Sequence, residues 1–87
     1  MSGWRLTFAS QARKDARKLA ASGLRPRAET LLAILEADPF QPPFESLLGD
    51  LRGYYSRRIS LQHRLVYEVI PEERIVRVLR MWTHYGD

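Results

Sequence analysis

The spacing of apolar and polar residues divides the first half of the chain into a short strand and two helices. Arg5–Phe8 has the composition of a strand. Ser10 is predicted to cap the first helix, Gly23 to end it, and Pro26 to open the second. The helices are expected to form an antiparallel hairpin, because the segment between them is short. Their apolar faces repeat at helical spacing: Ala12, Ala16, Leu19 and Ala20, then Ala28, Leu31, Leu32 and Leu35.

The second half is rich in β-forming residues and begins after a long loop. Pro39 stops the second helix and starts a proline-rich stretch within "DPFQPPFESLLGDLRG", residues 38–53. This segment is predicted to lack regular structure, and long loops in compact domains are often functional. Three strands follow in "YYSRRIS", "HRLVYEV" and "RIVRVLRMW", with "IPEE" as a hairpin turn. The expected fold is α+β, ordered β-α-α-β-β-β, with a mainly antiparallel sheet packed on one face by the helical hairpin.

Length and composition indicate one small domain, residues 1–87. The chain has no cysteine, which excludes a disulfide framework and a thiolate zinc site. Two histidines and scattered carboxylates disfavour any other metal site, and no cofactor is expected. No signal peptide is recognisable, and no apolar run approaches the roughly 20 residues that span a bilayer. A cytoplasmic protein without membrane contact is therefore expected.

The charge adds a preference for an anionic partner. The formal net charge is +4, and only Lys14 and Lys18 among the 14 basic residues are lysine. The planar guanidinium of arginine matches phosphate geometry, so this composition suits a polyanion. Charge alone favours nucleic-acid binding only slightly over a solvated, arginine-rich surface.

Strand alternation gathers polar side chains that suit RNA cleavage. A base takes the proton of the ribose 2′-OH, an acid protonates the leaving 5′-oxygen, and fixed positive charge stabilises the transition state. DNA, which lacks the 2′-OH, would not be cut. His84 can exchange a proton near neutral pH, and Arg57, Arg58 and Arg80 are candidates for binding phosphate. The last strand is expected to place Val76, Val78, Arg80, Trp82 and His84 on one face, with Arg64 on the neighbouring strand and Glu45 at the rim.

Each candidate also has a plainer interpretation. Glu45 alone is a solvated loop carboxylate. Arg57 and Arg58 face opposite sides of a strand, so at least one is a surface charge. Arg64 has Glu68 further along the same face as a partner.

The two histidines are equally ambiguous. His84 and Tyr85 taken alone favour a fraying chain end, and His63 is predicted to pack or to cap. A Ser56–His84 pair has no third orienting group and no nucleophile elbow. Spacing alone therefore leaves the nuclease interpretation open.

Three blocks of sequence resemble the YoeB (Txe/YoeB) family of toxins, which belongs to the RelE-like superfamily of toxin–antitoxin modules. They are "LRGYYSRRI" at 51–59, "HRLVY" at 63–67 and the terminal "HY" at 84–85, joined by Pro39-Phe40 and Glu45. The resemblance implies a microbial-RNase-like fold and a ribosome-dependent endoribonuclease that cuts mRNA in the ribosomal A site. It also implies neutralisation by a YefM-type antitoxin, and often a homodimer.

The resemblance also assigns roles to individual residues. Glu45 resembles the general base and His84 the general acid. Arg64 resembles the arginine that stabilises the scissile phosphate, and Arg58 a supporting phosphate-binding arginine. Tyr85 resembles a terminal tyrosine that orients the substrate.

The chain departs from the family pattern at four places. The glycine-containing loop that is familiar before the glutamate is here shortened and proline-rich, "QPPFES". Phe44 stands before Glu45 where proline is familiar, and Leu48 stands where a basic residue is common. Gly86 and Asp87 extend the chain beyond the tyrosine. Two other functions are weighed against the nuclease: a toxin of the same fold that inhibits a protein such as gyrase, and an RNA- or ribosome-binding module without catalysis.

Overall fold

The computed structural model describes residues 3–47 and 53–82 and confirms the α+β class. The sequence does not predict β2, whose two residues lie in the segment expected to lack regular structure. They follow the last proline of that segment, so both keep the backbone N–H that a strand needs. In chain order the elements are β1 (Arg5–Phe8), α1 (Ser10–Ala21), α2 (Arg25–Ala37), β2 (Glu45–Ser46), β3 (Tyr54–Arg58), β4 (Arg64–Ile70), a 3-10 turn (Pro71–Glu73) and β5 (Ile75–Arg80).

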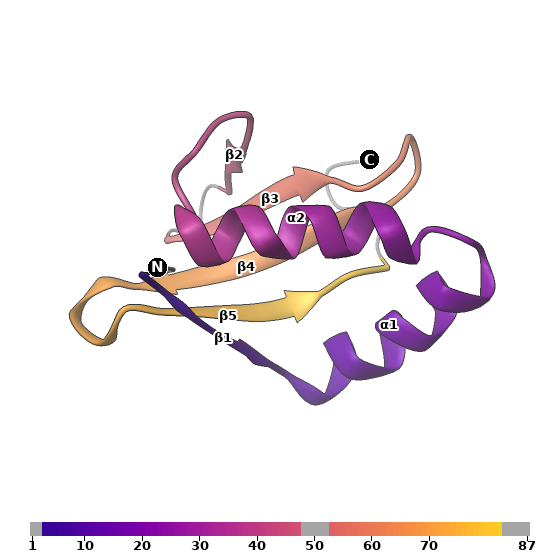
Figure 1. Cartoon of the computed structure of the whole chain (residues 1–87), viewed down its shortest axis with the longest axis horizontal. Helices are drawn as coiled ribbons and strands as arrows, with labels where there is room; N and C mark the ends of the chain where they lie inside the picture. Colours follow the sequence, from indigo (N-terminus) through magenta and orange to yellow (C-terminus); the bar gives the residue numbers. More distant parts are fainter. Residues whose placement is uncertain (1–2, 48–52, 83–87) are drawn as a thin grey trace.

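The strands of the described residues form one sheet in the order β1-β5-β4-β3-β2 (Figure 1). Neighbouring strands are antiparallel except β1 and β5, which run parallel. The sheet is therefore mixed, and the mainly antiparallel arrangement predicted from the sequence is confirmed. The short strand β2 forms one edge, next to β3.

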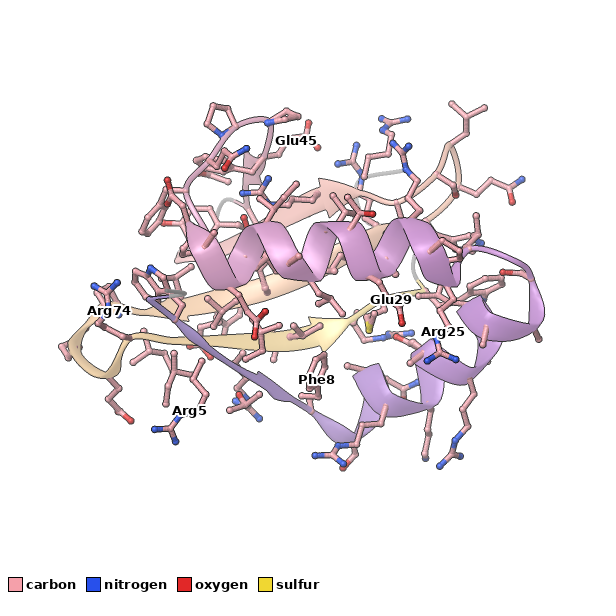
Figure 2. All side chains as sticks on the ribbon, viewed as in Figure 1. Arg5, Phe8, Arg25, Glu29, Glu45 and Arg74 are labelled. Carbon is pink, nitrogen blue, oxygen red and sulfur yellow. The ribbon has the colours of Figure 1, made fainter. Side chains whose placement is uncertain are left out.

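The core lies between the sheet and the two helices. Leu19 of α1 and Leu35 of α2 are at most 1% exposed. Complete burial of such a side chain contributes about 1.5–3 kcal/mol. The helices thus cover one face of the sheet, as the ribbon shows in Figure 1, while charged side chains line the outside of the molecule in Figure 2. The strand residues that pack in this core are Leu65, Tyr67, Val76 and Val78.

The helix ends agree with the sequence except at the two helix starts, since α2 begins at Arg25 and Pro26 is its second residue rather than its first. The backbone N–H of Arg13 donates to the carbonyl of Ala9, which has extended dihedral angles. Ala9 is therefore the N-cap and Ser10 the first helical residue, so the predicted Ser10 cap is wrong by one position. Gly23 adopts a φ of 82°, a conformation that a residue with a Cβ rarely takes, and it ends the turn after α1 as predicted.

The last strand is shorter than predicted and is not regular. β5 ends at Arg80, whereas the sequence predicts strand structure through Trp82 to His84. The register shifts so that Val78 opposes Tyr67 and Arg80 opposes Val66. Simple alternation therefore fails at the end of β5, and His84 lies outside the described residues.

Candidate active site

Glu45 and Arg64 meet on the sheet face that the helices leave open. The Nη1 of Arg64 donates a hydrogen bond to the Glu45 carboxylate and lies 3.4 Å from Oγ of Ser56. The Glu45 side chain is 63% exposed, whereas that of Arg64 is only 19% exposed. These three residues, from β2, β4 and β3, are called the Glu45–Arg64 site below.

Strand pairing explains why these side chains converge. Glu45 is paired with Ser56, and Ser56 with Val66. Paired residues of antiparallel strands point to the same side, and so do residues two apart in one strand, which places Arg64 on this face too. Arg58 is paired with Arg64 and is exposed, so it adds a second guanidinium to the same face.

The Glu45–Arg64 ion pair contributes little to stability. Its carboxylate is 63% exposed, and ion pairs at a solvated surface are typically worth about 0–1 kcal/mol. Glu68, the alternative partner of Arg64 suggested by the sequence, instead pairs with Arg77, with its Oε1 3.9 Å from Nη1 of Arg77. The structure thus holds a carboxylate that can accept a proton beside a fixed positive charge, which is the pairing that attack by a 2′-OH on a phosphate requires.

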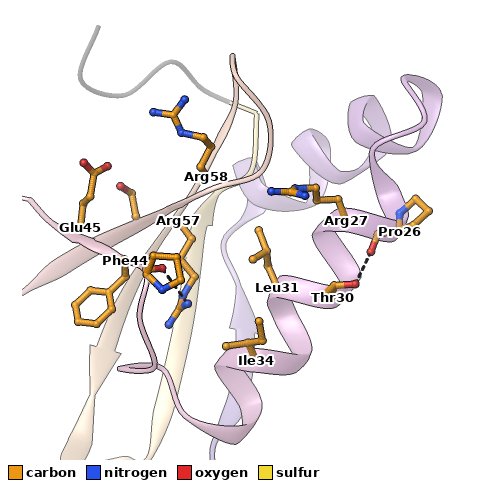
Figure 3. Close-up of a pocket in the computed structure, with 11 residues that line it drawn as sticks. Pro26, Arg27, Thr30, Leu31, Ile34, Phe44, Glu45, Arg57 and Arg58 are labelled. Atoms are coloured by element: carbon orange, nitrogen blue, oxygen red, sulfur yellow. Dashed lines mark hydrogen bonds between the residues drawn. The ribbon is translucent and has the colours of Figure 1, made fainter.

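Arg57 lies on the other side of β3 and is only 2% exposed. Its guanidinium donates hydrogen bonds to the hydroxyl of Tyr67 and to the carbonyls of Pro43 and Pro39. Figure 3 shows Arg57 on the opposite side of the strand ribbons from Glu45. The structure therefore does not bring this candidate phosphate ligand to the Glu45–Arg64 site.

Arg80 is also held within the protein, by a carboxylate of α1. Its Nε donates to Oδ2 of Asp15 in α1 at 2.8 Å. The same oxygen accepts the backbone N–H groups of Met81, at 2.9 Å, and Trp82, at 3.3 Å. These bonds draw both N–H groups out of the sheet ladder, which accounts for the end of β5 at Arg80.

The free energy of unfolding should depend on pH through the buried carboxylate of Asp15. Burial alone would raise the pKa of Asp15, but the hydrogen bonds from Arg80, Met81 and Gln11 outweigh it and hold that pKa below its ordinary value. A lowered folded-state pKa gives stability that is present above the unfolded pKa and lost as pH falls through the folded pKa. We expect Asp15→Asn to cost on the order of 3 kcal/mol at neutral pH. In urea unfolding, the difference in free energy of unfolding between this variant and wild type should shrink below about pH 4. A difference that stays constant down to about pH 2 would contradict this assignment.

His63 packs in the protein, as the sequence predicts, against Trp82 near the C-terminal end of the chain. This residue is 6% exposed, and its ring stacks on Trp82 with centroids 3.7 Å apart, which confirms a packing role. Trp82 is the last described residue. The predicted acid His84 and the predicted orienting residue Tyr85 lie outside the described residues, so their roles stay predictions.

A cleft of about 750 Å³ opens beside the Glu45–Arg64 site, between α2 and the β2–β3 edge (Figure 3). Leu31 and Ile34 of α2 and Phe44 line it, and the cationic groups of its lining are Arg27, Arg57 and Arg58. Clefts of this volume commonly hold small ligands. The candidate site therefore borders a concave, partly apolar space.

The sequence did not lead us to predict the structural roles of Asp15 and Tyr67, which hold Arg80 and the Pro39 carbonyl, respectively. A signal for Asp15 was present, because it lies three residues after Ala12 and four before Leu19, on the apolar face of α1. An acid on that face must be buried with partners. Tyr67 gave no such signal, since its hydroxyl reaches the carbonyl of Pro39, 28 residues away in sequence.

Comparison with known proteins decides the family. A family model described as a YoeB-like toxin of bacterial type II toxin–antitoxin systems matches residues 10–85. The chain belongs to the YoeB toxin family. A curated relative, Toxin YoeB of Streptomyces coelicolor, is 39% identical over 77 residues, covering 83% of this chain and 90% of the relative.

Solved YoeB structures have the same fold. The YoeB dimer of Staphylococcus aureus is 28% identical and superposes with a TM-score of 0.81, covering 97% of this chain and all of that one. A YoeB–YefM complex of S. aureus contains a chain 29% identical, with a TM-score of 0.78 over 94% of this chain and 98% of that one. The RelE-like fold expected from the sequence is thereby confirmed.

Two absences hold for the described residues of this YoeB-family toxin. In 3–47 and 53–82 no three side chains of the metal-binding types gather into a group that could hold an ion. No helix there is long and apolar enough to cross a bilayer.

Proposed function

We propose that this YoeB-family toxin is a metal-independent endoribonuclease that cleaves mRNA in the A site of the ribosome and so stops translation. The observation that carries the proposal is the pairing of the Glu45 carboxylate with the Arg64 guanidinium on an open sheet face. Membership in a toxin family supports it. Stability does not require such an exposed pair.

The proposed chemistry uses the positions of Glu45 and Arg64, and it gives His84 and Tyr85 the roles that the family resemblance implies. Glu45 takes the proton of the ribose 2′-OH, and the 2′-oxygen then forms a bond to the adjacent phosphorus. The bond from phosphorus to the 5′-oxygen breaks, and His84 gives that oxygen a proton. The products are a 2′,3′-cyclic phosphate and a free 5′-OH. Arg64 and Arg58 stabilise the extra negative charge on the phosphate while bonds form and break, and Tyr85 orients the substrate.

We further propose that a YefM-type antitoxin neutralises the toxin, and that the toxin forms a homodimer. The S. aureus relatives are titled as a YoeB–YefM complex and as a YoeB dimer, respectively. The place of action would be the cytoplasm, where mRNA is translated.

The expected result after expression without antitoxin is broken mRNA. RNA ends mapped across the transcriptome should show new 5′-OH ends inside coding regions within minutes of induction. Adding an inhibitor that clears mRNA from ribosomes should remove these ends, because free mRNA is not the substrate. Intact mRNA together with stalled replication would favour a gyrase-type target, and intact mRNA with ribosomes bound by the protein would favour a non-catalytic module.

A further inference from the structure

The segment that precedes Glu45 is held by hydrogen bonds from two buried side chains, Arg57 and Tyr67. Residues 38–44 connect α2 to β2, and they contain the carbonyls of Pro39 and Pro43 that Arg57 binds at 3.0 Å and 3.2 Å. The Tyr67 hydroxyl donates to the Pro39 carbonyl at 3.0 Å and accepts from Nε of Arg57 at 3.2 Å. One guanidinium and one phenol therefore tie both ends of this segment to β3 and β4.

Aromatic rings complete this arrangement. The Arg57 guanidinium lies 5.7 Å from the ring centre of Phe44 and 5.8 Å from that of Tyr67, which is within cation–π range. Phe44 is the residue immediately before Glu45, and it also packs edge-on against Tyr55 at 5.6 Å. The backbone that leads into Glu45 is thus fixed on the core side, while the Glu45 carboxylate emerges on the other side.

Burying the Arg57 guanidinium costs desolvation free energy, so stability of the fold alone does not explain this arrangement. Arg57 keeps its charge under all ordinary conditions, it is 2% exposed, and none of the ion pairs in residues 3–47 and 53–82 includes it. Burying a charge without a carboxylate partner is costly unless every donor is satisfied. Burial raises the pKa of Tyr67, so its hydroxyl stays protonated and able to donate at neutral pH.

We propose that Arg57 and Tyr67 are positioning residues that set the Glu45 carboxylate against Arg64 by holding the carbonyls of Pro39 and Pro43. They touch neither substrate nor reacting atoms. This inference rests on the proposed nuclease function. A strand of two residues such as β2 gains little from its own pairing, so its placement depends on what holds the segment before it. A shift of 1 Å in a reacting group can cost about 100-fold in rate.

The sharpest test is the pair Tyr67→Phe and Tyr54→Phe, each of which removes one hydroxyl. Tyr67 lies in β4 and Tyr54 in the neighbouring strand β3, but no hydrogen bond of the Tyr54 hydroxyl occurs among the described residues. We expect Tyr67→Phe to lower the turnover rate on mRNA-programmed ribosomes about 10-fold to 100-fold with little change in KM. Tyr54→Phe should keep the wild-type rate. Arg57→Lys, which keeps the charge but not the planar fork, should resemble Tyr67→Phe.

A second readout does not depend on activity. The Leu47 N–H donates to the Tyr54 carbonyl at 2.9 Å and reports β2–β3 pairing. Its hydrogen exchange should speed up at least 10-fold in Tyr67→Phe, while amides of α1 and β5 keep their protection. If Tyr67→Phe only lowers the melting temperature, and both turnover per folded molecule and Leu47 exchange stay at wild-type values, the inference is wrong. If wild type cuts no RNA, the proposed function fails, and unchanged Leu47 exchange would still overturn the positioning role by itself.

Discussion

Arg64→Ala should remove toxicity while leaving the protein folded. The Arg64 guanidinium already contacts the Glu45 carboxylate and lies 3.4 Å from Oγ of Ser56, so in the proposed mechanism it would meet a phosphate held beside Glu45. Losing a well-placed charged donor costs on the order of 10²–10³ in rate. The loss should appear in turnover more than in KM, because the charge that Arg64 stabilises exists mainly in the transition state. Growth after induction without antitoxin, together with cleavage of mRNA on ribosomes, measures the effect.

The matched control is Arg77→Ala. Arg77 is also a strand arginine paired loosely with a glutamate, at 3.9 Å, and its side chain is 52% exposed. Both variants lose one positive charge, so weaker general attraction to RNA affects them alike. Arg77→Ala should stay toxic, and the melting temperatures of both variants should stay near that of wild type. Full toxicity of Arg64→Ala would contradict the proposed site, and equal loss in both variants would point to charge alone.

The sequence predicts this fold well where spacing is informative. The apolar face of α2, the three long strands and the turn at Gly23 follow from local periodicity and from residues with special backbone preferences. In α1 the predicted face is only half right, because Ala12 and Leu19 are buried whereas Ala16 and Ala20 are exposed. The strand β2 could not be predicted, because it exists only through pairing with β3. The end of β5 could not be predicted either, because a carboxylate 66 residues earlier in the chain takes the N–H of Met81.

Part of the candidate site could likewise be predicted from the sequence, and part depends on contacts between residues far apart in the chain. Alternation along β3 and β4 correctly places Arg58 and Arg64 on one face and Arg57 on the other. Alternation does not reveal that Arg57 is buried, because that depends on carbonyls of Pro39 and Pro43 that only the folded chain brings close. Family resemblance supplies Glu45, whose loop sequence departs most from the pattern, and the structure places it beside Arg64.

The central claim is that Glu45 and Arg64 serve attack by a ribose 2′-OH, and the substrate can test this without any change in the protein. Ribosomes are programmed with two mRNAs of identical sequence, one of ordinary RNA and one with 2′-deoxy nucleotides throughout the A-site codon. Wild-type toxin should cut the first and leave the second intact, because without the 2′-oxygen no cyclic phosphate can form. The cut ordinary RNA should carry a 2′,3′-cyclic phosphate and a 5′-OH. Cleavage of the deoxy-substituted mRNA at the same rate would contradict the account.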